Sequence, residues 1–141
     1  MSIIIKSVNL NSKKEIYKFL EIAGSSLLKF RYFDTRDTDV LQNHLLTLLG
    51  YEGNKPVAYG HLDTEKGKLW LGICIAENYK GYGFGKEIMH NLVKKFNNQS
   101  PYDSLYLSVD RDNHAAISLY DKFHFSIIEE NELHYIMRLD R

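Results

Sequence analysis

Cysteine and proline are scarce in this sequence, and neither sign of charge is in excess. The 141 residues include one cysteine, Cys74, and two prolines. A single cysteine excludes an internal disulfide and a cysteine-based zinc cage. It fits a reducing cytoplasm, where we expect the protein to act. Because 18 Lys and Arg balance 18 Asp and Glu, the net charge gives no reason to expect nucleic acid or an anionic membrane as a partner.

Long hydrophobic runs are also missing. No apolar stretch approaches the roughly 20 residues that span a bilayer, and Met1–Leu10 has no charged leader followed by an apolar run, so we expect neither a membrane segment nor a signal peptide. Of the histidines only His114 and His124 fall near each other, without acidic partners at ligand spacing, so we expect no metal site. With 44% hydrophobic residues, the chain is expected to form one compact domain over residues 1–141.

Hydrophobic periodicity predicts alternating strands and helices. Ser12 and Glu15 have the spacing of a capping box, which predicts a helix that ends at Gly24. A short helix is expected over 37–44, another after residue 85 with apolar positions from Ile88 to Phe96, and a third capped by Asp112 or Asn113. Strands are expected at 3–8, 45–51, 56–63, 68–75, 104–109, 125–129 and 134–139.

The predicted order of elements indicates the fold class. The helix between strands 68–75 and 104–109 makes these two strands parallel if they are neighbours, while the other connections favour antiparallel pairing. We therefore expect an α/β (α+β) fold with a mixed, mostly antiparallel central sheet and flanking helices.

A glycine-rich segment, Lys80-Gly81-Tyr82-Gly83-Phe84-Gly85, joins a predicted strand to a predicted helix. Free amides at a helix start favour an anion, and glycines let the backbone approach a phosphate. The Walker A pattern fails because position 80 is not glycine and Glu87 replaces the Mg²⁺-binding hydroxyl. The dinucleotide pattern fails because Lys86 stands where its third glycine belongs.

The segment instead matches Arg/Gln-x-x-Gly-x-Gly/Ala, with Lys80 in place of Arg or Gln, and so resembles the pyrophosphate loop of the GNAT superfamily of acetyltransferases. A second segment, Asn113 to Phe125, resembles the GNAT pattern Asn-x-x-Ala-x-x-Leu-Tyr-x-x-x-Gly-Phe. There His124 replaces the usual glycine, so the turn after this helix is expected to be differently shaped or less strained. Two motifs in the right order are far more specific than either one.

This resemblance implies a GNAT-like domain in which acetyl-CoA lies between two splayed parallel strands and leaves as coenzyme A. The turn amides would hold the pyrophosphate and Asn113 the pantetheine arm. Tyr120 would stand near the coenzyme sulfur, where a phenol can protonate the departing thiolate, whose pKa is near the ~8.5 of cysteine, or hydrogen-bond to it. An amide at Ile73 or Ile75 would stabilise the oxyanion, with Gly72 easing a bulge. The expected cofactor-binding residues are Ile73, Cys74, Ile75, Lys80, Gly81, Tyr82, Gly83, Phe84, Gly85, Lys86 and Asn113.

Placement along the chain suggests the remaining site residues. An amine acceptor must lose a proton, and His61 and Glu77 are the leading candidates for the base, with Asp63, His44 and Asp110 as alternatives. The acceptor site is expected in residues 25–44, where aromatic rings can stack on a sugar and arginines can clamp an anion; the candidates are Phe30, Arg31, Tyr32 and Arg36. The competing interpretation is that these aromatics only pack the first helix onto the sheet.

Three functions follow from the resemblance. The first is transfer of acetyl from acetyl-CoA to a small-molecule primary amine, such as a nucleotide-linked amino sugar, by direct attack in a ternary complex. The second is a protein or peptide N-acetyltransferase, which should have a long open groove. The third is a non-catalytic acyl-CoA-binding module, against which Tyr120 and Asn113 argue. A homodimer is left open.

Overall fold

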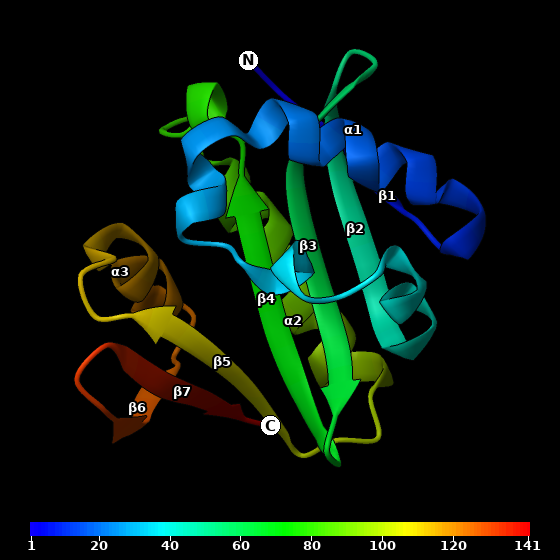
Figure 1. Ribbon diagram of the computed structural model, residues 1–141. Helices are drawn as coiled ribbons and strands as arrows, with labels where there is room; N and C mark the ends of the chain where they lie inside the picture. Colours follow the sequence, from blue (N-terminus) through cyan, green and yellow to red (C-terminus); the bar gives the residue numbers. More distant parts are fainter.

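The computed structural model describes residues 1–141, and its seven strands form one sheet (Figure 1). The spatial order is β1-β2-β3-β4-β5-β7-β6. Only β4 and β5 run parallel; the other neighbours are antiparallel. The predicted fold class is therefore confirmed. The strands are β1 (Ile4–Ser7), β2 (His44–Glu52), β3 (Lys55–Glu65), β4 (Lys68–Ile75), β5 (Ser104–Asp110), β6 (Ser126–Glu130) and β7 (His134–Asp140).

Helices cover both faces of the sheet. Phe19 of α1 stacks on Tyr59 of β3 at 5.8 Å, while Ile88 of α2 lies against Gly60, the next residue of β3. Successive strand residues point to opposite faces, so α1 and α2 pack on opposite sides, as Figure 1 shows. The helices are α1 (Lys13–Ala23), α2 (Phe84–Gln99), α3 (His114–Lys122) and the 3₁₀ turns η1 (Leu10–Ser12), η2 (Gly24–Leu28), η3 (Tyr32–Asp34), η4 (Thr38–Asn43) and η5 (Glu77–Tyr79).

The apolar stripes predicted for the helices form the core between these layers. Ile16 and Phe19 of α1, and Ile88, Leu92 and Phe96 of α2, are fully buried. No helix is long and apolar enough to cross a membrane.

The parallel pair β4–β5 opens into a V. The two strands pair only at Leu69–Leu105 and Trp70–Tyr106. Beyond Trp70 they diverge, and Figure 1 shows β5, β7 and β6 turning away from β4. The splayed parallel pair expected from the sequence is thus present, with its vertex beside Trp70.

Three local expectations were wrong. Ser12 makes no capping hydrogen bond, because it ends the turn η1 and its ψ of 14° is not the extended backbone of a capping residue; Glu15 binds Lys18 and accepts the Tyr51 hydroxyl at 2.7 Å. The register of β3 against β4 is unbroken past Gly72, so there is no bulge at that residue. The turn after α3 is not relaxed, since His124 keeps the left-handed φ of +73° that glycine usually takes there.

Candidate active site

One large cavity follows the V. Its volume is about 1770 Å³, larger than the roughly 300–1,000 Å³ of most small-ligand pockets. It runs from the start of α2, between β4 and β5, to the segment Gly24–Asp34 and β3, and α3 forms part of its wall. There is room for two reactants side by side.

The start of α2 faces this cavity with unsatisfied amides. Gly81 and Gly83 have φ of +86° and +83°, and a Cβ at either position would meet nothing within 4 Å. No side chain caps the helix, so the first-turn N–H groups are free for an anion. Lys80 and Lys86 also line the cavity and have no carboxylate partner. This end of the cavity can hold a diphosphate.

Backbone amides of β4 point into the V. The Ala76 amide donates to the Val57 carbonyl of β3 at 2.9 Å, and N–H directions alternate along a strand. The amides of Ile73 and Ile75 therefore point away from β3, toward the space that β5 has left. They can donate to a thioester carbonyl.

Tyr120 of α3 stands across the V from these amides. The residue is only 6% exposed, yet its hydroxyl has no partner in the protein and is not sealed from solvent. It therefore opens on the cavity, which Tyr120 lines. Burial, and to a lesser extent nearby Cys74, raises the pKa of Tyr120, so the phenol keeps its proton at neutral pH. Burial also raises the pKa of the Cys74 thiol to about 12, so Cys74 is not a nucleophile at neutral pH.

Asn113 has a structural role in addition to any contact with a ligand. It caps α3, with its side-chain oxygen accepting the Ala116 amide at 3.4 Å. Its amide nitrogen makes no hydrogen bond in the protein, and the residue lines the cavity. That nitrogen is free for a ligand.

His61 lies on β3, in the wall opposite α3. The residue is 2% exposed, and its Nδ1 is 2.7 Å from the hydroxyl of fully buried Tyr59. That hydroxyl has no other partner, and leaving its hydrogen unsatisfied would cost about 1–3 kcal/mol. Tyr59 therefore donates to Nδ1, and the His61 proton sits on Nε2. Burial, His44 and Arg36 lower the pKa of His61 well below its ordinary value, so it is a neutral hydrogen-bond donor.

A buried polar chain continues the same wall. The Tyr32 hydroxyl lies 2.8 Å from both Asp63 Oδ2 and His44 Nε2, and His44 Nδ1 lies 2.7 Å from the Thr47 hydroxyl. Burial, assisted by Arg36, lowers the pKa of His44 to about 4. Burial raises the pKa of Asp63, whose Oδ1 is the one buried side-chain oxygen or nitrogen without a partner.

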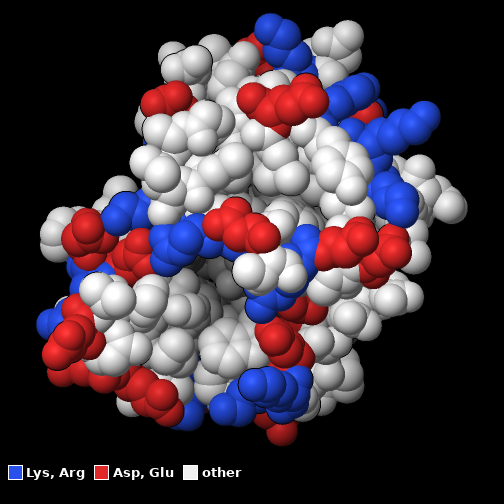
Figure 2. Space-filling view, in the orientation of Figure 1, with Lys and Arg blue, Asp and Glu red and all other residues white.

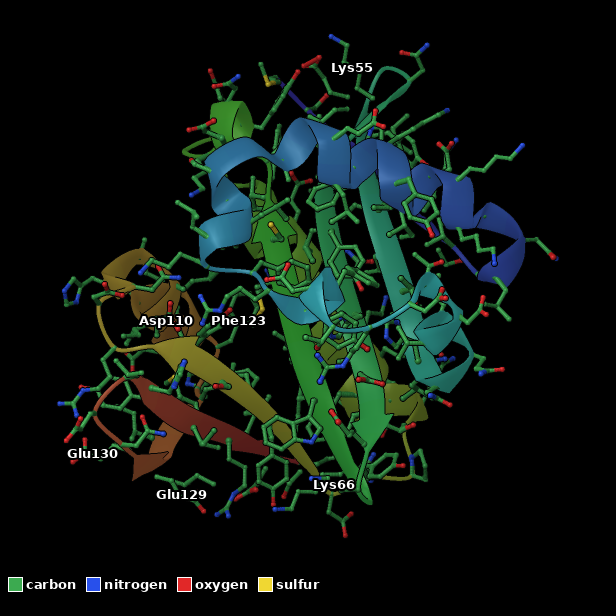
Figure 3. The ribbon with its side chains drawn as sticks, viewed as in Figure 1. Lys55, Lys66, Asp110, Phe123, Glu129 and Glu130 are labelled. Carbon is green, nitrogen blue, oxygen red and sulfur yellow. The ribbon has the colours of Figure 1, made fainter.

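The segment Gly24–Asp34 crosses the opening of the V and is held to the end of β5. Lys29 pairs with Asp112 at 2.6 Å and with Asp110 at 3.5 Å, and Arg31 pairs with Asp110 at 3.1 Å. Figure 3 shows Asp110 where β5 ends, and Figure 2 shows Lys, Arg, Asp and Glu side chains interleaved around the central hollow. These ion pairs are partly exposed and therefore weak, but they hold the segment beside the end of β5.

The predicted acceptor residues all line the cavity, although the arginines are already occupied. Phe30 lies 5.3 Å from Tyr59 and 6.1 Å from Tyr32, so it also packs the segment on the sheet. Arg36 stacks 4.4 Å over the Tyr32 ring and pairs with Glu65 at 3.4 Å. With Arg31 held by Asp110, neither guanidinium is a free clamp for an anion.

Two predicted site residues do not line the cavity. The Glu77 carboxylate accepts the Ser25 hydroxyl, which lowers its pKa, and the residue lies outside the cavity wall. Tyr82 is 52% exposed and stacks outward on Phe84 at 5.8 Å, so only its backbone can serve the turn. Glu77 therefore lies away from the cavity in which we expected it to act as the base.

The residues that hold His61, His44 and the segment Gly24–Asp34 in place were not identified from the sequence. Tyr59 and Thr47 were not singled out, nor was the pairing of Lys29 and Arg31 with Asp110. The alternation Tyr59-x-His61-x-Asp63 on one strand was the available signal, because a period of two places all three side chains on one face.

Comparisons with known proteins agree with this geometry. Residues 13–125 match the Acetyltransferase (GNAT) family. The chain is 32% identical to N-alpha-acetyltransferase 50 of Danio rerio over 123 residues, which cover 84% of this chain and 73% of that protein. It is 34% identical to spermine/spermidine N(1)-acetyltransferase of Bacillus subtilis over 64 residues, 45% of this chain and 42% of that protein.

Among solved structures, the PaiA N-acetyltransferase of Thermoplasma acidophilum in complex with coenzyme A shares the fold. Its TM-score is 0.76 at 18% identity, and the match covers 100% of both chains.

The open V, the uncapped helix start and the cavity phenol define an acyl-CoA-dependent transferase. The chain belongs to the GNAT acetyltransferase family, an enzyme family that uses acetyl-CoA as its acetyl donor.

Proposed function

We propose that this protein transfers the acetyl group of acetyl-CoA to a primary amine of a small molecule, by direct attack within a ternary complex. The observation that carries the proposal is the continuous cavity, which joins the uncapped start of α2 to the polar wall on β3 and passes Tyr120 on the way.

Each part of the reaction is assigned to residues that line the cavity. The first-turn amides of α2, with Lys80 and Lys86, hold the diphosphate, and Asn113 donates to the pantetheine arm. The amide of Ile73 or Ile75 donates to the thioester carbonyl and stabilises the oxyanion that forms when the amine attacks. The Tyr120 hydroxyl gives its proton to the sulfur as the thiolate leaves, the acylated nitrogen loses a proton to solvent, and the phenolate regains one from solvent. No covalent enzyme intermediate is needed.

The segment Gly24–Asp34 supports a small acceptor. Lys29 and Arg31 tie this segment to Asp110 and Asp112, so it narrows access to the acceptor side of the cavity from the end of β5. Because Arg31 and Arg36 are paired with carboxylates, an anionic acceptor such as a nucleotide-linked amino sugar would have to displace those partners. An acceptor without phosphate fits the pocket better.

A peptide α-amine is the second candidate acceptor. It is favoured by the identity to N-alpha-acetyltransferase 50, which extends over 84% of this chain. The partly exposed ion pairs of Lys29 and Arg31 would have to open to admit a peptide.

An acceptor panel tests the proposal. Release of coenzyme A thiol from acetyl-CoA is measured with spermidine, a short peptide with a free α-amine, and a UDP-linked amino sugar. We expect amine-dependent release, fastest with a small amine that carries no phosphate. Tight acetyl-CoA binding without release for any amine would favour the non-catalytic module.

A further inference from the structure

Asp63 is a buried carboxylate in the wall of the proposed acceptor pocket, and the only basic group within 4 Å of it is the neutral imidazole of His44, whose Nε2 lies 3.9 Å from Asp63 Oδ1. Its side chain is 4% exposed, its Oδ2 accepts only the Tyr32 hydroxyl, and its Oδ1 has no partner. Arg36, whose charge acts on Asp63, is paired with Glu65 and stacked on Tyr32. Burial raises the pKa of Asp63 more than the Tyr32 hydroxyl, the Arg36 charge and the Thr64 amide lower it, so a carboxylate so placed gains by taking up a proton.

The hydrogen bonds around Tyr32 have a fixed direction. An ionised carboxylate can only accept, so Tyr32 donates its hydrogen to Asp63 Oδ2. The Tyr32 oxygen then accepts from His44 Nε2–H, and His44 Nδ1 accepts from the Thr47 hydroxyl. One lone pair of the Tyr32 oxygen is left over, and Tyr32 lines the cavity.

We propose that Tyr32 and Asp63 form the proton relay that deprotonates the acceptor. The Tyr32 oxygen takes a proton from the acceptor ammonium as the N–H bond breaks, and the original hydroxyl hydrogen of Tyr32 passes to Asp63 Oδ2. The ammonium becomes a neutral amine whose lone pair attacks the thioester, and the carboxylate becomes a carboxylic acid that later returns its proton to solvent. The relay rests on the proposed function, because it needs an amine acceptor.

The other candidate bases are less suited to this step. His61 carries its proton on Nε2, since Tyr59 donates to Nδ1, so it offers the cavity a donor. Glu77 lies outside the cavity. The charged and titratable groups around Asp63 are Tyr32 and Arg36, His44 of β2, and His61 and Glu65 of β3; of these, His44 donates to the relay and remains neutral.

The test compares Asp63→Asn with wild type in a pH profile of kcat/KM, using the best acceptor of the panel. For wild type we expect kcat/KM to rise with pH at the acid end of the profile and then to become independent of pH. At pH 7 the kcat/KM of the variant should be lower by about 100-fold. It should rise about tenfold per pH unit until the pH reaches the pKa of the amine, because the variant reacts only with amine that is already deprotonated in solution. Tyr32→Phe should show the same profile, and the double variant should be no worse than either single one.

The chain offers a matched control. Glu15 on α1 also accepts a tyrosine hydroxyl, from Tyr51 at 2.7 Å, but neither residue lines the cavity. Glu15→Gln and Tyr51→Phe should leave the pH profile unchanged. Affinity for acetyl-CoA, measured on every variant, shows that the fold is intact.

Two outcomes separate the claims. If wild type acetylates an amine and Asp63→Asn keeps both the rate and the acid limb, the relay is wrong while the proposed function stands. If wild type acetylates no amine, the proposed function has failed first.

Discussion

The imidazole of His61 covers Gly72 on the neighbouring strand, so that a Cβ at Gly72 would lie 2.4 Å from His61 Nε2. The two residues are direct partners in the β3–β4 ladder. The ring cannot move away freely, because it is bonded to Tyr59 and lies 4.3 Å from the Tyr32 ring. Because Gly72 has no side chain, the imidazole of His61 can lie over it in the wall of the proposed acceptor pocket.

Gly72→Ala should therefore reduce activity as well as stability. Overpacking of this kind costs about 1–3 kcal/mol, and the displaced His61 would disturb Tyr32. Gly60→Ala is the matched control, because its Cβ would lie 2.4 Å from Ile88 on the α2 side, outside the cavity. Thermal midpoints should fall in both variants, while kcat/KM well below the midpoint should fall only in Gly72→Ala. Equal activities would contradict the assignment of this wall to the acceptor.

Tyr120→Phe separates chemistry from binding. The hydroxyl has no partner in the protein, so its loss leaves no buried group unsatisfied and should change stability little. We expect kcat to fall by about 100-fold as the thiolate loses its acid, with the Kd of acetyl-CoA within about threefold of wild type. Steady-state kinetics and calorimetric titration measure the two quantities. A parallel loss of rate and affinity would mean that the phenol only shapes the coenzyme site.

The backbone geometry of the expected coenzyme half of the site could be predicted from the sequence more readily than that of the acceptor half. The turn Lys80–Gly85 and the segment from Asn113 to Phe125 are local patterns, whose backbone geometry follows from neighbouring residues. The wall of Tyr32, His44 and Asp63 joins three elements, and no local spacing records that they meet. The contact of Glu77 with Ser25 was hidden for the same reason, because it bridges distant parts of the chain.

Lys80 offers a test of the diphosphate site. The lysine is unpaired and stands where the family pattern has Arg or Gln. Lys80→Arg should bind coenzyme A at least as tightly, because a guanidinium can form two parallel bonds to phosphate. Lys80→Glu should weaken binding by roughly tenfold or more, and less so at high salt. Calorimetric titration at two salt concentrations measures both; unchanged affinity in Lys80→Glu would place the diphosphate elsewhere.

Replacing His124 with glycine should stabilise the protein. Its φ of +73° is unfavourable for a residue with a Cβ by about 1–2 kcal/mol, partly offset because glycine loses more entropy on folding. His124→Gly should raise the free energy of unfolding by up to about 1 kcal/mol, measured by urea denaturation. A clear loss of stability would show that the histidine side chain makes a contact that outweighs the strain.

Stability should fall as the pH drops below about 6.5, the ordinary pKa of histidine. The unfolded chain then binds a proton at His44, whereas the folded protein does not until about pH 4. This mismatch amounts to roughly 3 kcal/mol over the whole window. His61, with its lowered pKa, acts in the same direction, and Asp63, with its raised pKa, acts in the opposite one.

Urea denaturation at pH 7.5 and 5.5 measures this dependence. His44→Gln should flatten it, while the same change at His114, which is exposed on α3, serves as the control. If the free energy of unfolding changes equally between pH 7.5 and 5.5 in wild type and in His44→Gln, the neutral, buried state of His44 is contradicted.

A crystal structure of the complex with coenzyme A tests the account most directly. We predict phosphate oxygens within hydrogen-bonding distance of the amides of Phe84, Gly85 and Lys86, the pantetheine between β4 and β5, and the sulfur beside the Tyr120 hydroxyl. Coenzyme bound outside the V, or a sulfur remote from Tyr120, would contradict it.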